Sequence, residues 1–140
     1  LQYNSTTSNY TSTARVARTD TGQWLTKRFE LNNAVFRNGQ NAQADFRFNR
    51  FTDDLVIRSV RVIKEAVLSV SADLGNGGTA NGLTNIDTVG DGNVTYATVD
   101  GRSAISLDGS SSQKYAYFRI DDGFFHQLAC GDIYCHAYFW

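Results

Sequence analysis

Short stretches in which apolar and polar residues alternate recur along most of the chain. The clearest covers residues 114–122, where Ala116, Phe118 and Ile120 occupy every second position. Successive side chains of a β-strand point to opposite faces, so this period of 2 predicts strands with one buried face. Further stretches of this kind cover residues 24–31, 55–63, 67–72, 96–99, 104–107 and 133–140.

Asn-Gly and Asp-Gly pairs, which favour tight turns, lie between these stretches. Among them are Asn38-Gly39, Asp100-Gly101 and Asp108-Gly109. Asparagine, aspartate and glycine tolerate the positive φ angles of hairpin turns. No stretch has a convincing helical period. The sequence therefore predicts an all-β fold, a two-sheet antiparallel β-sandwich or jelly roll, formed by residues 1–140 as one domain.

The same alternation predicts one core between the two sheets. Its expected members are Phe29, Leu31, Phe46, Ile57, Val60, Ala116, Phe118 and Ile120.

Charge and hydropathy narrow the class of protein. The 140 residues carry a formal net charge of -1 and no basic stripe, which argues against a nucleic-acid partner. No apolar run approaches the roughly 20 residues of a membrane helix, so no membrane partner is expected. The polar first stretch and the non-initiator Leu1 suggest a mature or excised, secreted or cell-surface product.

Several tripeptide and tetrapeptide patterns lie along the chain. They are Gly22-Gln23-Trp24, Phe29-Glu30-Leu31, Ala34-Val35-Phe36, Ala44-Asp45-Phe46-Arg47, Leu55-Val56-Ile57 and Val60-Arg61-Val62. Together with residues 115–122 and 1–5, they resemble galactose-binding-like β-sandwich accessory modules of secreted bacterial carbohydrate-active enzymes. The resemblance implies a non-catalytic domain that binds a polysaccharide or other glycan.

The order of these segments differs from their order in that family. In the family, the equivalent of residues 115–122 comes before the equivalent of residues 1–5, whereas in this chain it comes after. Halves 1–66 and 67–140 are therefore in permuted order. Three arrangements fit: a permuted module, one phase of a tandem array, or a strand exchanged between subunits of a homopolymer. The last would make this chain a structural, self-assembling subunit of an extracellular fibre, sheath or surface layer.

Cys130 and Cys135 enclose four residues and, in a secreted chain, predict a disulfide. Two reduced buried thiols are the alternative. A zinc site with His126 and His136 is a weaker one, because the spacing matches no common zinc motif.

Three Asn-X-Ser/Thr sequons begin at Asn4, Asn9 and Asn93. Such motifs arise by chance in a chain rich in these residues, but two lie close together in the polar N-terminal stretch. All three are candidate glycosylation sites in a host that glycosylates.

The main candidate binding surface is an aromatic stripe of Tyr134, His136, Tyr138 and Trp140, at alternate positions of the last predicted strand. Rings on an exposed face stack on sugar rings. Tyr115 and Tyr117 are expected to extend this stripe. The alternative is that the rings pack between sheets or against a neighbouring subunit, because large aromatic side chains are mostly buried.

Catalytic and metal-binding motifs are not evident. The sequence has no Gly-x-Ser-x-Gly elbow, phosphate loop or His-Glu-x-x-His motif, so no enzymatic activity and no cofactor are expected. Calcium remains an alternative ligand of loop carboxylates, although no EF-hand spacing occurs. These carboxylates belong to Asp87, Asp91, Asp100, Asp121 and Asp122.

Overall fold

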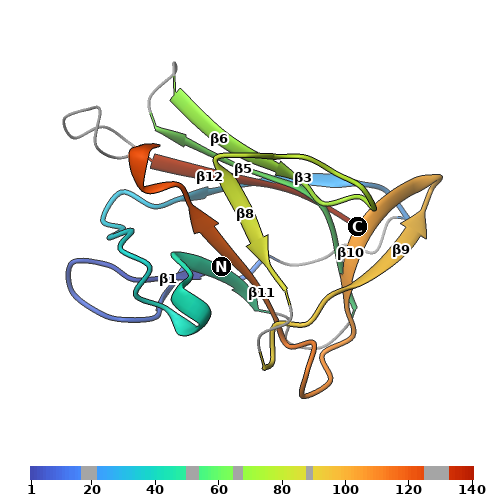
Figure 1. Cartoon of the computed structure of the whole chain (residues 1–140), viewed down its shortest axis with the longest axis horizontal. Coiled ribbons are helices and arrows are strands. Elements are labelled where there is room, and N and C mark those ends of the chain that lie inside the picture. The colour runs from blue at the N-terminus through green and yellow to red at the C-terminus, as the bar shows by residue number, and fades with distance from the viewer. Residues whose placement is uncertain (17–21, 50–53, 65–67, 88–89, 125–132) are drawn as a thin grey trace.

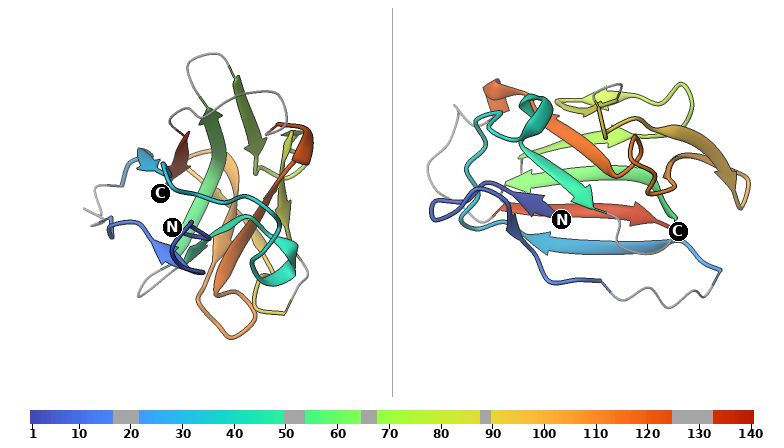
Figure 2. Two further views of the ribbon diagram at one scale, coloured as in Figure 1. Left: turned by 90° about the vertical axis from the view of Figure 1, so that its left-hand side faces the viewer. Right: turned by 90° about the horizontal axis from the view of Figure 1, so that it is seen from below.

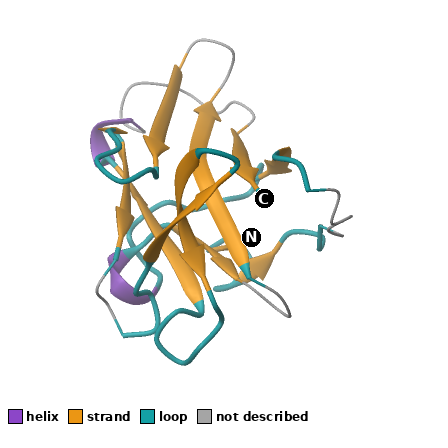
Figure 3. Cartoon of the chain, turned by 90° about the vertical axis from the view of Figure 1, so that its right-hand side faces the viewer, coloured by secondary structure: helices purple, strands orange, loops and turns teal. Residues whose placement is uncertain are grey.

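The computed structural model describes residues 1–16, 22–49, 54–64, 68–87, 90–124 and 133–140. Among these residues the chain forms two antiparallel sheets packed face to face, which confirms the predicted all-β sandwich (Figure 1). The two short 3₁₀ turns, Asn41–Gln43 and Asp122–Phe124, lie in connections between strands (Figure 3). None of the described segments is a helix of the length and hydropathy needed to cross a membrane.

The five-stranded sheet takes three strands from the first 49 residues and two from the second half of the chain. Its order is β2 (Thr11–Ser12), β1 (Gln2–Tyr3), β4 (Phe46–Asn49), β11 (Tyr115–Ile120) and β8 (Leu83–Ile86).

In the seven-stranded sheet, residues 133–139 form the strand next to one edge. The main order is β3 (Leu25–Glu30), β12 (Ile133–Phe139), β5 (Leu55–Lys64), β10 (Arg102–Leu107) and β9 (Thr95–Val99). In addition, β6 (Leu68–Asp73) pairs with β5, and β7 (Ala80–Asn81) pairs with β6. Figure 2 shows β12 lying between β3 and β5 in this layer.

A β-bulge at Arg58 divides the long strand β5. Tyr138 of β12 pairs with Ser59, whereas Phe139 pairs with Ile57, so Arg58 is the extra residue. On its other edge, β5 pairs with β10 before the bulge and with β6 after it. The Arg58 guanidinium pairs with the Asp73 carboxylate, and the Arg58 carbonyl accepts a hydrogen bond from Leu74 at 2.8 Å.

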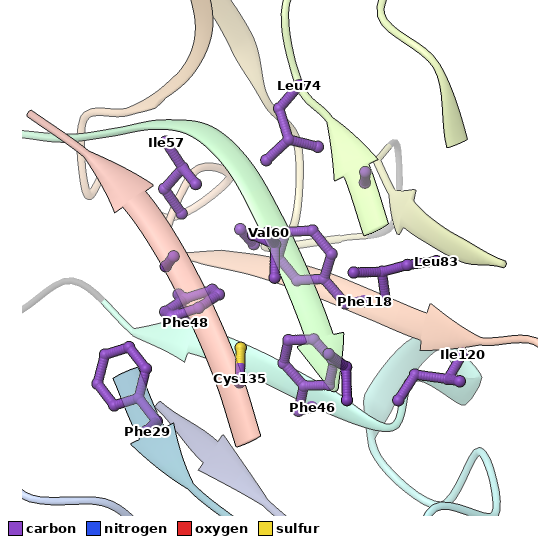
Figure 4. Packing of buried hydrophobic residues seen from close by; sticks show 14 of the residues in the cluster. Phe29, Phe46, Phe48, Ile57, Val60, Leu74, Leu83, Phe118, Ile120 and Cys135 are labelled. Atoms are coloured by element: carbon purple, nitrogen blue, oxygen red, sulfur yellow. The ribbon is translucent and has the colours of Figure 1, made fainter. Parts of the chain in front are cut away.

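The core lies between the sheets and is centred on phenylalanine rings (Figure 4). Phe46 and Phe118 are stacked with their centroids 5.2 Å apart, and Phe48 meets Phe118 edge-on at 5.7 Å. All eight predicted core residues are buried, with exposed fractions of 7 % or less. Ile57 and Val60 lie three residues apart, so the β-bulge at Arg58, and not alternation alone, brings both to the inner face.

Candidate functional site

The structure divides the predicted aromatic stripe between opposite sheets. His136, Tyr138 and Trp140 follow β12 in the seven-stranded sheet, whereas Tyr115 and Tyr117 belong to β11 in the five-stranded sheet. The expectation that the two tyrosines extend the stripe is therefore wrong. Both strands alternate as predicted, but their outer faces point to opposite sides of the sandwich.

Tyr117 is fully buried although it lies on the outer face of its sheet. Its hydroxyl accepts a hydrogen bond from the Arg47 guanidinium at 3.2 Å and donates one to the Asp91 carboxylate at 2.9 Å. Burial, followed by the hydrogen bond to Asp91, raises the pKa of the phenol. Tyr117 is thus covered by polar partners, which leaves its ring no open face for a ligand.

Arg47 is the centre of this covering cluster. Its guanidinium lies 3.9 Å from the ring centroid of Tyr115 and 4.9 Å from that of Tyr10. Its Nε donates to the Gln2 amide oxygen at 2.9 Å. These cation–π and hydrogen-bond contacts join β1 and the following loop to β4 and β11, so the cluster has a structural role.

Three aromatic rings gather on the outer face of the seven-stranded sheet, and we call them the aromatic platform: Trp24, Tyr138 and Trp140. The Trp24 ring stacks on Tyr138 with centroids 5.1 Å apart and meets Trp140 edge-on at 5.5 Å. All three residues are half-buried, so the platform is neither fully exposed nor part of the core.

The sheet register explains why these rings meet. Thr26 of β3 pairs with Tyr138 of β12, which brings Trp24, just before β3, to the end of β12. The backbone nitrogen of Trp140 donates to the Val56 carbonyl at 3.0 Å and fixes the end of the chain against β5. Cys135, Ala137 and Phe139 fill the inner face, so the intervening residues face outward.

Basic side chains border the aromatic platform. Arg102 of β10 lies with its guanidinium 5.6 Å from the Tyr138 ring centroid and hydrogen-bonds the Tyr138 hydroxyl. His136 pairs with Arg28 of β3 and with Arg61 of β5. Burial, with the charges of Arg28 and Arg61, lowers the pKa of His136.

Tyr134 continues the same strand and pairs with Glu30 and Ile63, but its side chain lies outside the described part of the structure. Trp24 is the platform residue that sequence reasoning did not assign to the site. The local signal was present, since Trp24 alternates with Leu25 at the start of a predicted strand. What the sequence did not reveal was that this strand lies beside residues 133–140.

Cys135 is a free thiol in the core, so the structure does not support the predicted Cys130–Cys135 disulfide. The side chain is on the inner face of β12 and fully buried, where its sulfur lies in the cluster with Phe29, Phe46 and Phe48 (Figure 4). Burial strongly raises the pKa of this thiol. Cys130 and His126, and with them the zinc alternative, lie outside the described residues.

The three sequons differ in accessibility. Asn9 is exposed, whereas Asn4 and Asn93 are half-buried. The Asn4 side-chain oxygen accepts a hydrogen bond from the Gln40 side-chain amide at 3.1 Å, and the Asn4 side-chain nitrogen lies against Gly39. Asn9 is therefore the sequon that the structure leaves open to modification.

The loop carboxylates do not assemble into a metal centre within the described ranges, where no three His, Cys, Asp or Glu side chains come together. Asp91 instead accepts the Tyr117 hydroxyl, and Asp121 caps the turn at Gly123 with a hydrogen bond of 2.8 Å. The calcium alternative gains no support from this arrangement.

Fold and surface together define an all-β sandwich with an aromatic platform on one outer face. No protein-family model, no curated protein and no solved structure matches the chain.

Proposed function

We propose that this chain is a non-catalytic, extracellular β-sandwich module that binds a polysaccharide or other glycan through the aromatic platform. The observation that carries the proposal is the meeting of Trp24, Tyr138 and Trp140 on one outer face, from segments far apart in the sequence. Partly exposed rings of this kind provide flat apolar surface for the C–H face of a sugar ring.

The polar groups around the platform suit the same ligand. The Arg102 guanidinium and the His136 imidazole border the rings, and both offer hydrogen-bond partners for sugar hydroxyls. Such a combination of flat apolar surface and a few placed polar groups is typical of small-ligand recognition. The resemblance of the sequence patterns to carbohydrate-binding accessory modules points to the same class of ligand.

Affinity gel electrophoresis against a panel of soluble polysaccharides tests this function. We expect one or more polysaccharides to retard the native chain, and Trp24→Ala or Trp140→Ala to abolish the retardation. Tyr96→Ala is the matched control, because Tyr96 is 56 % exposed but is not part of the platform. The absence of retardation by any polysaccharide, or unchanged retardation of both tryptophan variants, would refute the proposal.

Intrinsic fluorescence gives an independent measurement. The chain contains two tryptophans, and both belong to the platform. A ligand on the platform should therefore change the tryptophan emission, whereas a ligand at a distant surface should leave it unchanged.

A further inference from the structure

Three nitrogen-bearing side chains lie in one row across the outer face of the seven-stranded sheet. His136 of β12 pairs directly with Arg28 of β3 and with Arg61 of β5. Directly opposed side chains on one face of antiparallel strands have Cβ atoms about 4.5–5.5 Å apart. We call Arg28, His136 and Arg61 the basic row.

The described partners of the two arginines in the basic row are either exposed or uncharged. Glu30 lies 3.9 Å from Arg28, but both side chains are more than half exposed, and such a pair contributes little. The Arg61 guanidinium donates to the hydroxyl of Ser69 at 2.8 Å, which is a neutral partner. On β6, Asp73 pairs with Arg58 rather than with the row.

Arg28 and Arg61 lie on the two strands that flank β12, so their backbones are about 10 Å apart with His136 between them. After burial, the charges of Arg28 and Arg61 are the next causes of the lowered pKa of His136, so both guanidiniums act on the imidazole between them. Arg28 and Arg61 are both exposed, so this face offers two guanidiniums to a ligand of opposite charge.

The basic row is continuous with the aromatic platform. His136 and Tyr138 are two residues apart on the same face of β12, which corresponds to about 7 Å along the strand. Arg102 adds a further guanidinium at the Tyr138 ring. A sugar ring stacked on the platform therefore has the basic row within reach of its neighbouring residues.

From this juxtaposition we infer that the glycan is an acidic polysaccharide, whose uronate carboxylates pair with Arg28 and Arg61 while a sugar ring stacks on the aromatic platform. The inference rests on the proposed function and specifies its substrate class. A guanidinium offers a planar pair of donors that matches a carboxylate, which favours uronates over neutral sugars.

Polygalacturonate and its methyl ester test the role of the ligand carboxylates. The two polymers share a sugar backbone, but the carboxylates are charged only in the first. We expect the native chain to bind polygalacturonate at least about tenfold more tightly than the ester. Binding should weaken as the salt concentration rises from about 50 to about 500 mM, because exposed charges are screened.

The Arg28→Gln/Arg61→Gln double variant should lose at least about tenfold in affinity for polygalacturonate. The Arg37→Gln/Lys114→Gln variant is the matched control: it removes the same two charges from exposed residues outside the row and should bind as the native chain does. A cooperative urea unfolding transition like that of the native chain shows that the double variant is folded.

Protonation of His136 adds a third charge to the row. The charged groups that face it are Arg28 and Glu30 of β3 and Arg61 of β5. Polygalacturonate binding should therefore strengthen between about pH 7.5 and about pH 5, and His136→Gln should remove that increase.

The outcomes separate this inference from the proposed function. Equal binding of the acid and the ester, with the row variant unaffected and the tryptophan variants inactive, refutes the acidic ligand but leaves a glycan-binding platform. Preference for a sulfated polysaccharide over polygalacturonate refutes the carboxylate assignment. Loss of all polysaccharide binding refutes both.

Discussion

At the scale of single residues, the buried carboxylate of Asp45 supports the connection between β4 and the end of β11. One carboxylate oxygen accepts the Asn38 backbone N–H at 2.9 Å, and the other accepts that of Ile120 at 2.8 Å. Burial raises the pKa of this carboxyl, although both backbone donors oppose the increase. Without this carboxylate, the backbone N–H groups of Asn38 and Ile120 would lose their hydrogen-bond acceptor.

Asp45→Asn should destabilise the fold by about 1–3 kcal/mol, because asparagine has one carbonyl oxygen and its NH₂ group would face a backbone N–H. Urea unfolding measures the change. Asp87→Asn, at an exposed aspartate, should stay within about 0.5 kcal/mol of the native chain. Equal effects of the two substitutions would show that the Asp45 hydrogen bonds contribute nothing.

His136 should make stability depend on pH in a defined direction. Its pKa in the folded chain lies below the ordinary value of 6.5, so the unfolded chain binds the proton more tightly. Stability is then fully present above about pH 6.5 and is lost as the pH falls toward the folded-state pKa. His136→Gln should lose less stability between about pH 7.5 and about pH 5 than the native chain does. Identical losses would contradict this.

The thiol of Cys135 gives a direct test of the disulfide. Because the thiolate is the reactive form and burial disfavours it, an alkylating reagent should leave Cys135 unmodified in the native chain. In urea without reductant, the reagent should modify it, as peptide mass analysis would show. Modification only after reduction would instead establish the bridge to Cys130.

The candidate site shows which part of a surface is locally encoded. That His136, Tyr138 and Trp140 share one face follows from the alternation of their own strand, whereas the sequence left open whether this face is outward or packed. The partnership of Trp24 with Tyr138 depends instead on the pairing of β3 with β12, strands separated by most of the chain. The sequence also did not show that Tyr115 and Tyr117 lie in the other sheet, because this too depends on which strands pair.

At the scale of elements, the longer strands with alternation were predicted from the sequence, whereas β4 and β8, with four residues each, were not. The hairpin of β9 and β10 follows from Asp100-Gly101, where both residues have positive φ angles, of 52° and 69°. By contrast, β1, β2 and β7 have two residues each, too few for a period to be recognised. Their extended conformation is set by the neighbouring strands.

The turn between β6 and β7 requires a glycine at position 78. A Cβ atom there would lie 2.2 Å from the Asp73 carbonyl oxygen, and that backbone is held by the Asp73 N–H bond to Thr79. Gly78→Ala should therefore cost at least about 2 kcal/mol in the free energy of unfolding.

Gly77→Ala is the control, because Gly77 has a φ of +76° but no atom within 4 Å of the added carbon. It should cost only about 1 kcal/mol, the strain of a left-handed alanine. If both variants unfold at the same urea concentration, the close contact at Gly78 is not a constraint.

At the scale of the whole molecule, both halves of the chain contribute strands to both sheets. Residues 1–66 supply β1, β2 and β4 to one sheet and β3 and β5 to the other, and the second half supplies the rest. Composition and alternation predicted two sheets but not this interleaving, because strand order depends on contacts between distant segments. The interleaving means that neither half has a complete sheet of its own.

The pairing of β1 also bears on self-assembly. Gln2 and Tyr3 pair with Arg47 and Phe46 of the same chain on one side and with β2 on the other. Pairing within one chain fits a permuted module and one phase of a tandem array. In a fibre built by exchange of this strand, β1 would instead pair with a neighbouring subunit.

The remaining sheet edges determine whether the chain associates in solution. The six-residue edge strand β3 exposes Lys27, Arg28 and Glu30, and Lys27 pairs with the inward-facing Ala137. Charges on an edge, above all on its inward side, prevent another strand from adding to the sheet.

We therefore expect a single species with the mass of one chain in sedimentation velocity, unchanged as the protein concentration rises. Lys27→Val should permit association by uncovering this edge, and Lys114→Val, away from β3, should not. Filaments or a concentration-dependent mass of the native chain would instead favour the self-assembling subunit.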